Sequence, residues 1–168
     1  RIVALDERGT PLTTVALAVT AAMAMAACGK KPEEKAAAQQ QMPAVPVGVK
    51  HLVSLLTLAA FVLLAAAYVP GNHLKAKLHH PMILGVKLWA FGHLIANNTL
   101  ADLLLFGGFL AWAVLSFRAA RRRDKAAGTT YAPGQAARTG IAVVVGVAAW
   151  AGFAFWAHGA WIGVRPFG

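Results

Sequence analysis

The sequence predicts an all-α fold, a polytopic transmembrane helical bundle of about four spanning helices behind a signal-like or short hydrophobic N-terminal helix. Two observations predict it. The chain is 58% hydrophobic and only 13% charged, whereas soluble domains average about 25% charged residues. Uncharged apolar runs also recur, and each approaches the roughly 20 residues that a helix needs to cross a bilayer. The lipid bilayer is therefore the first predicted partner.

The N-terminal part differs in composition from the remainder. Residues 1–28 contain basic residues, an apolar run over 15–27 and small residues before Cys28, a pattern typical of a secretory signal with a lipidation cysteine. Residues 29–50 are rich in Ala, Gln and Pro and predict a disordered linker. Their "QQQMPAVPVGV" resembles the early mature segment of periplasmic adaptor lipoproteins of RND efflux pumps, so a fused adaptor fragment is one alternative. The other is an uncleaved short span at 15–27.

Residues 51–168 form the predicted transmembrane domain. The first span ends at Pro70, and the second begins with Pro81 at the first helical position, where proline is favoured. Only residues 97–99 separate the second and third spans, which therefore pair as an antiparallel hairpin. Thr99 and Asp102 fit a capping box at the start of the third span. The predicted spans cover residues 52–69, 81–96, 100–117 and 140–157.

The basic residues predict topology. The formal net charge is +10, but lysine and arginine gather between spans, which favours membrane orientation over nucleic-acid binding. With four spans, the loops at 70–80 and 118–139 lie on the same side, and the positive-inside rule makes them cytoplasmic. The predicted location is the bacterial inner membrane, with no nucleic-acid partner. Lys87 is expected to reach the cytoplasmic interface by extending along its helix.

The histidines are the main candidates for chemistry. Among six histidines, His51, His93 and His158 fall near the outward ends of three different predicted helices. Imidazoles from different helices suit haem iron, which takes two axial ligands. Asn97 lies four residues after His93 and is predicted to hydrogen-bond its ring and fix its tautomer. The alternative for His93 is an interhelical hydrogen bond without a cofactor, and His80 either acts as a ligand or caps the helix that Pro81 begins.

Several other residue patterns narrow the function. Small residues leave room for close helix packing or for a flat macrocycle. Three tryptophans near the ends of the fourth span are predicted to be interface anchors. The single cysteine excludes a disulfide framework, and the absence of paired carboxylates or a nucleophile–base pair argues against hydrolysis. The small residues are Gly85, Gly92, Gly107, Gly108 and Ala111, and the tryptophans are Trp150, Trp156 and Trp161.

Longer motifs in the second part of the chain carry a family resemblance. "HPM" begins at His80, "WAFGHLIANN" covers 89–98, "LFGGFLAWA" covers 105–113 and "HGAWIGV" covers 158–164. From about residue 55 to 168 the chain therefore resembles the NnrU family of bacterial integral membrane proteins.

What the resemblance implies is a role in denitrification, where NnrU is implicated in producing active nitrite and nitric oxide reductases. The related plant zeta-carotene isomerase binds haem b through histidines, which implies haem b here at His80, His93 or His158, with His93 and His158 as iron ligands. The expected function is a haem-b-binding inner-membrane protein linked to denitrification or to an isomerase-like reaction, and whether it is an enzyme stays open. The expected partners are denitrification enzymes or another membrane protein. The alternative is a cofactor-free membrane assembly factor.

Overall fold

The computed structural model describes residues 46–97 and 99–167, and all regular secondary structure in these two ranges is helical. This confirms the predicted all-α class. The predicted leader with Cys28, and the linker up to residue 45, lie outside the described residues. The helices are α3 (Val47–Tyr68), α4 (His73–Leu78), α5 (Pro81–Ala96), α6 (Leu100–Ala127), α7 (Ala136–Gly152), the π-helical turn η1 (Phe153–Ala157) and α8 (His158–Ile162).

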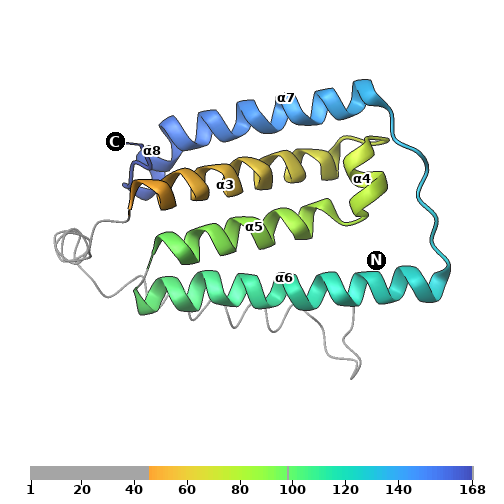
Figure 1. Ribbon diagram of the computed structural model, residues 1–168, viewed down its shortest axis with the longest axis horizontal. Helices are drawn as coiled ribbons and strands as arrows, with labels where there is room; N and C mark the ends of the chain where they lie inside the picture. The colour runs from red at the N-terminus through yellow and green to blue at the C-terminus, as the bar shows by residue number, and fades with distance from the viewer. Residues whose placement is uncertain (1–45, 98, 168) are drawn as a thin grey trace.

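The four long helices lie side by side in the order α7, α3, α5, α6 (Figure 1). Small residues allow the backbones to approach, because a Cβ on Gly85 of α5 would lie 2.9 Å from the carbonyl oxygen of Ala60 in α3. A Cβ on Gly146 of α7 would lie 2.5 Å from the Cα of Val62 on the other side of α3. Close packing at small residues is the usual way that membrane helices associate. Helix α3 is therefore the centre of the described bundle.

Helix lengths support three of the four predicted spans. Helices α3 and α6, and the continuous segment Ala136–Ile162, are long and apolar enough to cross a membrane. Helix α5 has the predicted bounds, Pro81–Ala96, but its 16 residues give it a length of only about 24 Å. It therefore falls short of the roughly 30 Å hydrocarbon core, and it packs between α3 and α6.

Three of the predicted spans were too short, since the observed helices are longer. Helix α3 begins at Val47, so the end of the predicted linker is helical. Helix α6 runs to Ala127 rather than stopping at residue 117, because Arg, Lys and Ala favour helix even where the apolar run has ended. The last span begins at Ala136 and continues through η1 to Ile162.

Local capping signals were read correctly. The Thr99 hydroxyl accepts a hydrogen bond from the Asp102 amide at 3.1 Å, and the Asp102 carboxylate accepts one from the Thr99 amide at 3.4 Å. This is the predicted capping box. At the other end of α6, Gly128 adopts a left-handed conformation with φ of 60°, which glycine tolerates without steric cost.

The two loops predicted to share a side of the membrane do pack together. The Gln135 amide donates to the Gly71 carbonyl at 2.8 Å, and the His73 amide donates to the Thr139 hydroxyl at 2.9 Å. A Cβ on Gly134 would lie 2.3 Å from the backbone nitrogen of His73, so only glycine fits there. The segments 70–80 and 128–135 consequently form one end of the molecule, called the loop end below.

Candidate functional site

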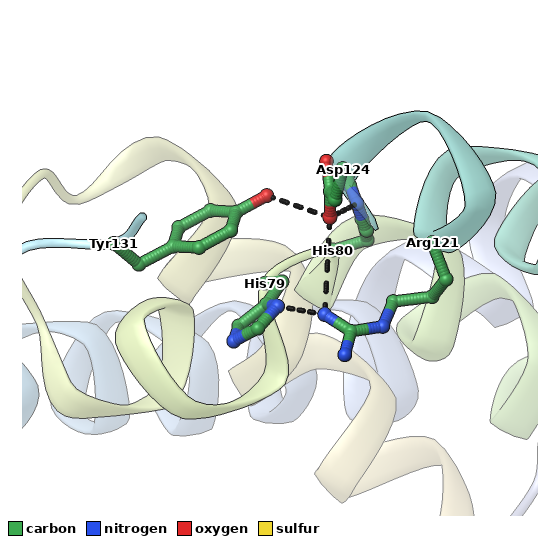
Figure 2. Close-up of polar contacts among 5 residues, drawn as sticks. All are labelled: His79, His80, Arg121, Asp124 and Tyr131. Carbon is green, nitrogen blue, oxygen red and sulfur yellow. Dashed lines mark hydrogen bonds and ion pairs between the residues drawn. The ribbon is translucent and has the colours of Figure 1, made fainter. Parts of the chain in front are cut away.

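Two groups of histidines lie at opposite ends of the bundle. The first is at the loop end, where five side chains from the α4–α5 connection, α6 and the loop after α6 meet (Figure 2). The His80 Nε2 lies 2.8 Å from the Asp124 Oδ2, and the Tyr131 hydroxyl donates to the same oxygen at 3.1 Å. The Arg121 guanidinium lies 3.8 Å from that oxygen. We call His79, His80, Arg121, Asp124 and Tyr131 the loop-end cluster.

A strained turn directs the two adjacent histidines to different partners. His79 has φ of 66° and ψ of −49°, and the His80 amide donates to the Leu78 carbonyl at 2.8 Å. This is the rare γ-turn with positive φ, and such backbone costs about 1–3 kcal/mol unless its surroundings hold it. The His79 ring stacks on Tyr131 at 4.1 Å and contacts Arg121, which are the contacts that hold it.

His80 does not cap α5 through its side chain. It occupies the N-cap position without a side-chain capping hydrogen bond, and its ring pairs with Asp124 instead. Lys87 extends toward the same end, as expected. Its Nζ lies 4.8 Å from the centre of the Phe117 ring. The Phe117 ring in turn packs edge-on against the His80 ring. His80 is therefore the N-cap residue of α5 by position, as predicted, but its side chain takes no part in the capping.

The loop-end cluster makes Tyr131 harder to ionise. Partial burial raises the pKa of the Tyr131 phenol above its ordinary value, and the hydrogen bond to Asp124 and the negative charge of that carboxylate raise it further, while Arg121 opposes the change. The hydroxyl consequently remains a donor at neutral pH. Beside the cluster is an open pocket of about 600 Å³. Its lining residues are His79, Arg121, Arg122, Asp124, Lys125, Gly128 and Thr129.

The second group lies at the opposite end and consists of His93 in α5 and His158 in α8, the bundle-end histidines. The Nδ1 of His93 lies 2.9 Å from the Trp89 carbonyl oxygen, and the Nδ1 of His158 lies 2.6 Å from the Val164 carbonyl oxygen. A carbonyl only accepts hydrogen bonds, so Nδ1 donates in both rings. In each neutral imidazole the lone pair is consequently on Nε2.

Aromatic side chains surround the bundle-end histidines. The His93 ring lies 4.7 Å from Phe106 and 5.0 Å from Trp89, and the His158 ring lies 5.6 Å from Phe153. Each ring therefore lies against aromatic side chains of its own, His93 against Trp89 and Phe106 and His158 against Phe153.

The hydrogen bond predicted between Asn97 and the ring of His93 was wrong. The Asn97 side-chain amide donates to the backbone carbonyl of His93 at 2.8 Å and so closes the end of α5. The ring is oriented by the Trp89 carbonyl, one turn earlier in the same helix. The carbonyl of a helical residue lies within reach of the side chain four positions later, so Asn97 bonds the backbone carbonyl of His93 rather than its ring.

The other predicted candidates are distributed along the bundle. His80 directly precedes α5 and His93 lies in its last turn, so the two are about 20 Å apart along the helix axis and cannot ligate one haem. His51 lies at the start of α3 and is exposed. Within residues 46–97 and 99–167, no three metal-binding side chains converge.

Among the tryptophans, Trp150 is an interhelical contact, since its Nε1 donates to the Thr57 hydroxyl at 3.1 Å. Trp156 and Trp161 are exposed, as expected for interface anchors.

Sequence reasoning missed Asp124 and Asn72. Asp124 is the only carboxylate within the basic stretch at 118–125. A single acidic residue among basic ones indicates a specific pairing partner. Asn72 follows Pro70 and Gly71 and is fully buried. This position is the corresponding signal for a helix N-cap. The asparagine directly follows a helix-terminating proline and glycine and precedes the next helix.

Comparison with known proteins agrees with the arrangement of apolar helices. The family model described as NnrU protein matches residues 3–166, and this match begins well before the resemblance noted from residue 55. No curated protein and no solved structure matches the chain. The match covers nearly the entire sequence, so the chain belongs to the NnrU family of membrane proteins.

Proposed function

We propose that this NnrU-family protein binds haem b in the bacterial inner membrane, with His93 and His158 as the two axial ligands. The observation that carries the proposal is the shared hydrogen bonding of the two rings. Both Nδ1 atoms donate to backbone carbonyls, which leaves both Nε2 lone pairs for a metal. This arrangement is typical of metal-ligating histidines, because the second hydrogen bond fixes the tautomer and makes the ligand nitrogen more basic.

The donor set also suits haem better than a bare metal ion. Haem iron needs only two protein ligands, commonly histidines on different helices, whereas a structural zinc site needs four. Phe106, Trp89 and Phe153 add apolar and aromatic surface next to the rings, which a flat macrocycle would contact. When bound, haem supplies one-electron redox and Lewis-acid chemistry.

The use of that chemistry follows from the family. We propose that the protein supports production of active nitrite and nitric oxide reductases, or carries out an isomerisation like that of zeta-carotene isomerase. The loop end would face the cytoplasm, since it carries the basic residues at 118–125. The chain's own part in either role is to hold two neutral imidazoles in fixed orientation within an apolar site.

An absorption spectrum tests the haem proposal. The full chain, purified in detergent from haem-replete cells, is expected to show a Soret band that disappears in His93→Ala and in His158→Ala. His51→Ala is the matched control, because His51 lies in the first turns of α3 and is exposed. A colourless preparation, or a Soret band that survives both substitutions, would overturn the assignment.

A second candidate is a cofactor-free membrane factor that assembles denitrification enzymes through helix contacts. The open face of α6 favours it, since within the described residues a Cβ on Gly108 would meet no atom within 4 Å. Leu104 and Leu115 of the same helix are also exposed. Under this reading Gly108→Leu abolishes nitrite reductase production in cells but His93→Ala does not. The haem reading predicts the reverse.

A further inference from the structure

We propose that the pocket at the loop end binds a phosphate group with net negative charge, at the membrane surface. The lining contains three cationic side chains, Arg121, Arg122 and Lys125, and one carboxylate, Asp124. Asp124 contacts His80, accepts from Tyr131 and lies 3.8 Å from Arg121, so it offsets one of the three positive charges. Within residues 46–97 and 99–167, Arg122 and Lys125 form no ion pair. The pocket therefore has a surplus of positive charge.

The pocket also holds one guanidinium in place before any ligand arrives. Arg121 contacts the His79 ring and lies 3.8 Å from the Asp124 Oδ2. His79 is in turn fixed by its γ-turn and by stacking on Tyr131. A planar guanidinium binds phosphate through two parallel hydrogen bonds, and prior orientation reduces the entropy lost on binding. The strained turn at His79 thus has a use, which is to support Arg121.

The depth of the pocket relative to lipid favours a phosphate at the headgroup level. The uncharged part of α6 ends at Phe117, and Arg121 follows it by about one helical turn, roughly 6 Å. Lys125 follows by about two turns, roughly 12 Å. The headgroup layer extends about 5–8 Å beyond the hydrocarbon on each side, so Arg121 and Arg122 lie at the level of lipid phosphates. Basic pockets at this level attract anionic headgroups.

Lipid binding to the full chain in detergent tests the proposal. Native mass spectrometry with added phosphatidylglycerol or phosphatidylcholine would measure how much lipid stays bound. We expect retention of phosphatidylglycerol and about tenfold weaker binding in Arg121→Gln. Arg123→Gln is the matched control, because it removes the same charge from an adjacent exposed position that does not line the pocket. It should change binding less than about twofold.

Two further measurements identify the source of the phosphate and exclude misfolding as the cause of weaker binding. Displacement of the lipid by millimolar inorganic phosphate indicates that a free phosphate also fits, whereas resistance to it indicates a lipid headgroup. Arg122→Gln gives a second variant that disturbs no contact within the loop-end cluster. Equal weakening by Arg121→Gln and Arg123→Gln, or equal retention of phosphatidylcholine, would overturn the proposal. His93→Ala should leave lipid binding intact, which separates this site from the haem site.

Discussion

Replacing Asn72 should destabilise the protein more than any other single polar substitution at the loop end. Helix α3 ends beside Pro70, which has no amide hydrogen, so the Ala66 carbonyl lacks its normal helical donor. The Asn72 side-chain amide takes its place at 2.7 Å and also donates to the Val69 carbonyl. Its oxygen accepts from the Lys75 amide at 2.7 Å as the N-cap of α4. One buried side chain thus ends one helix and begins the next.

The magnitude follows from these three bonds. Loss of the N-cap costs about 1 kcal/mol. The buried Ala66 carbonyl left without a partner costs a further 1–3 kcal/mol or so, and the partly buried Val69 carbonyl costs less. We therefore expect Asn72→Ala to lower the free energy of unfolding by about 3 kcal/mol. Asn72→Asp keeps the capping oxygen but places a carboxylate against both carbonyls, so it should be no more stable than the alanine variant.

Unfolding of the purified chain in mixed detergent and dodecyl sulfate micelles, followed by circular dichroism, would measure both variants. Helical content in mild detergent confirms beforehand that each variant folds. The reasoning fails if Asn72→Ala lies within about 0.5 kcal/mol of the parent protein, since such a value is ordinary for a surface position. It also fails if Asn72→Asp matches the parent, because then the two carbonyls did not need the amide.

Two further predictions concern packing and pH. Gly146→Val should destabilise the protein by about 1–3 kcal/mol, because its Cβ would lie 2.5 Å from the backbone of α3. Gly140→Ala should not, because a Cβ there would meet no atom within 4 Å. The same unfolding assay checks both variants, and equal effects would contradict the close contact at Gly146. In a Tyr68→Phe background, ultraviolet absorbance should show Tyr131 ionising above its ordinary value of 10.0, and less so after Asp124→Asn. Because the folded pKa is raised, Tyr131 adds stability below its ordinary pKa and loses it as pH rises through the raised one; an ordinary midpoint would refute this.

Local features were predictable from the sequence because neighbouring residues determine them. The bounds of α5 and the capping box at Thr99 depend on proline, threonine and aspartate within a few positions of each other. For the loops at 70–80 and 118–139, the sequence predicted that they lie on the same side of the membrane but not that they contact each other. The contact that creates the loop-end cluster joins His80 to Asp124 across the bundle, and no hydrophobic period encodes such a pairing.

The bundle-end histidines show the same division. Apolar flanks and topology were enough to place His93 and His158 at one end of the molecule, but not to choose the partner of each ring. His51 is exposed on α3, since equal depth in a membrane does not determine which face of a helix a side chain occupies. The rotation of α3 is fixed by Gly85 and Gly146 packing on either side of it, which is a tertiary property.

The widened turn η1 determines the direction of the His158 ring. Within it the His158 amide donates to the Phe153 carbonyl, five residues earlier, so this turn accommodates one residue more than an α-helical turn. Each residue of an α-helix rotates the next side chain by about 100°, so a regular helix of the same sequence would aim His158 at a different neighbour. Deleting Ala154 should therefore straighten the segment yet keep the imidazole on its present face, while a one-residue deletion inside α7 would rotate it to a different face. The extra residue in η1 thus determines how α8 is rotated about its own axis.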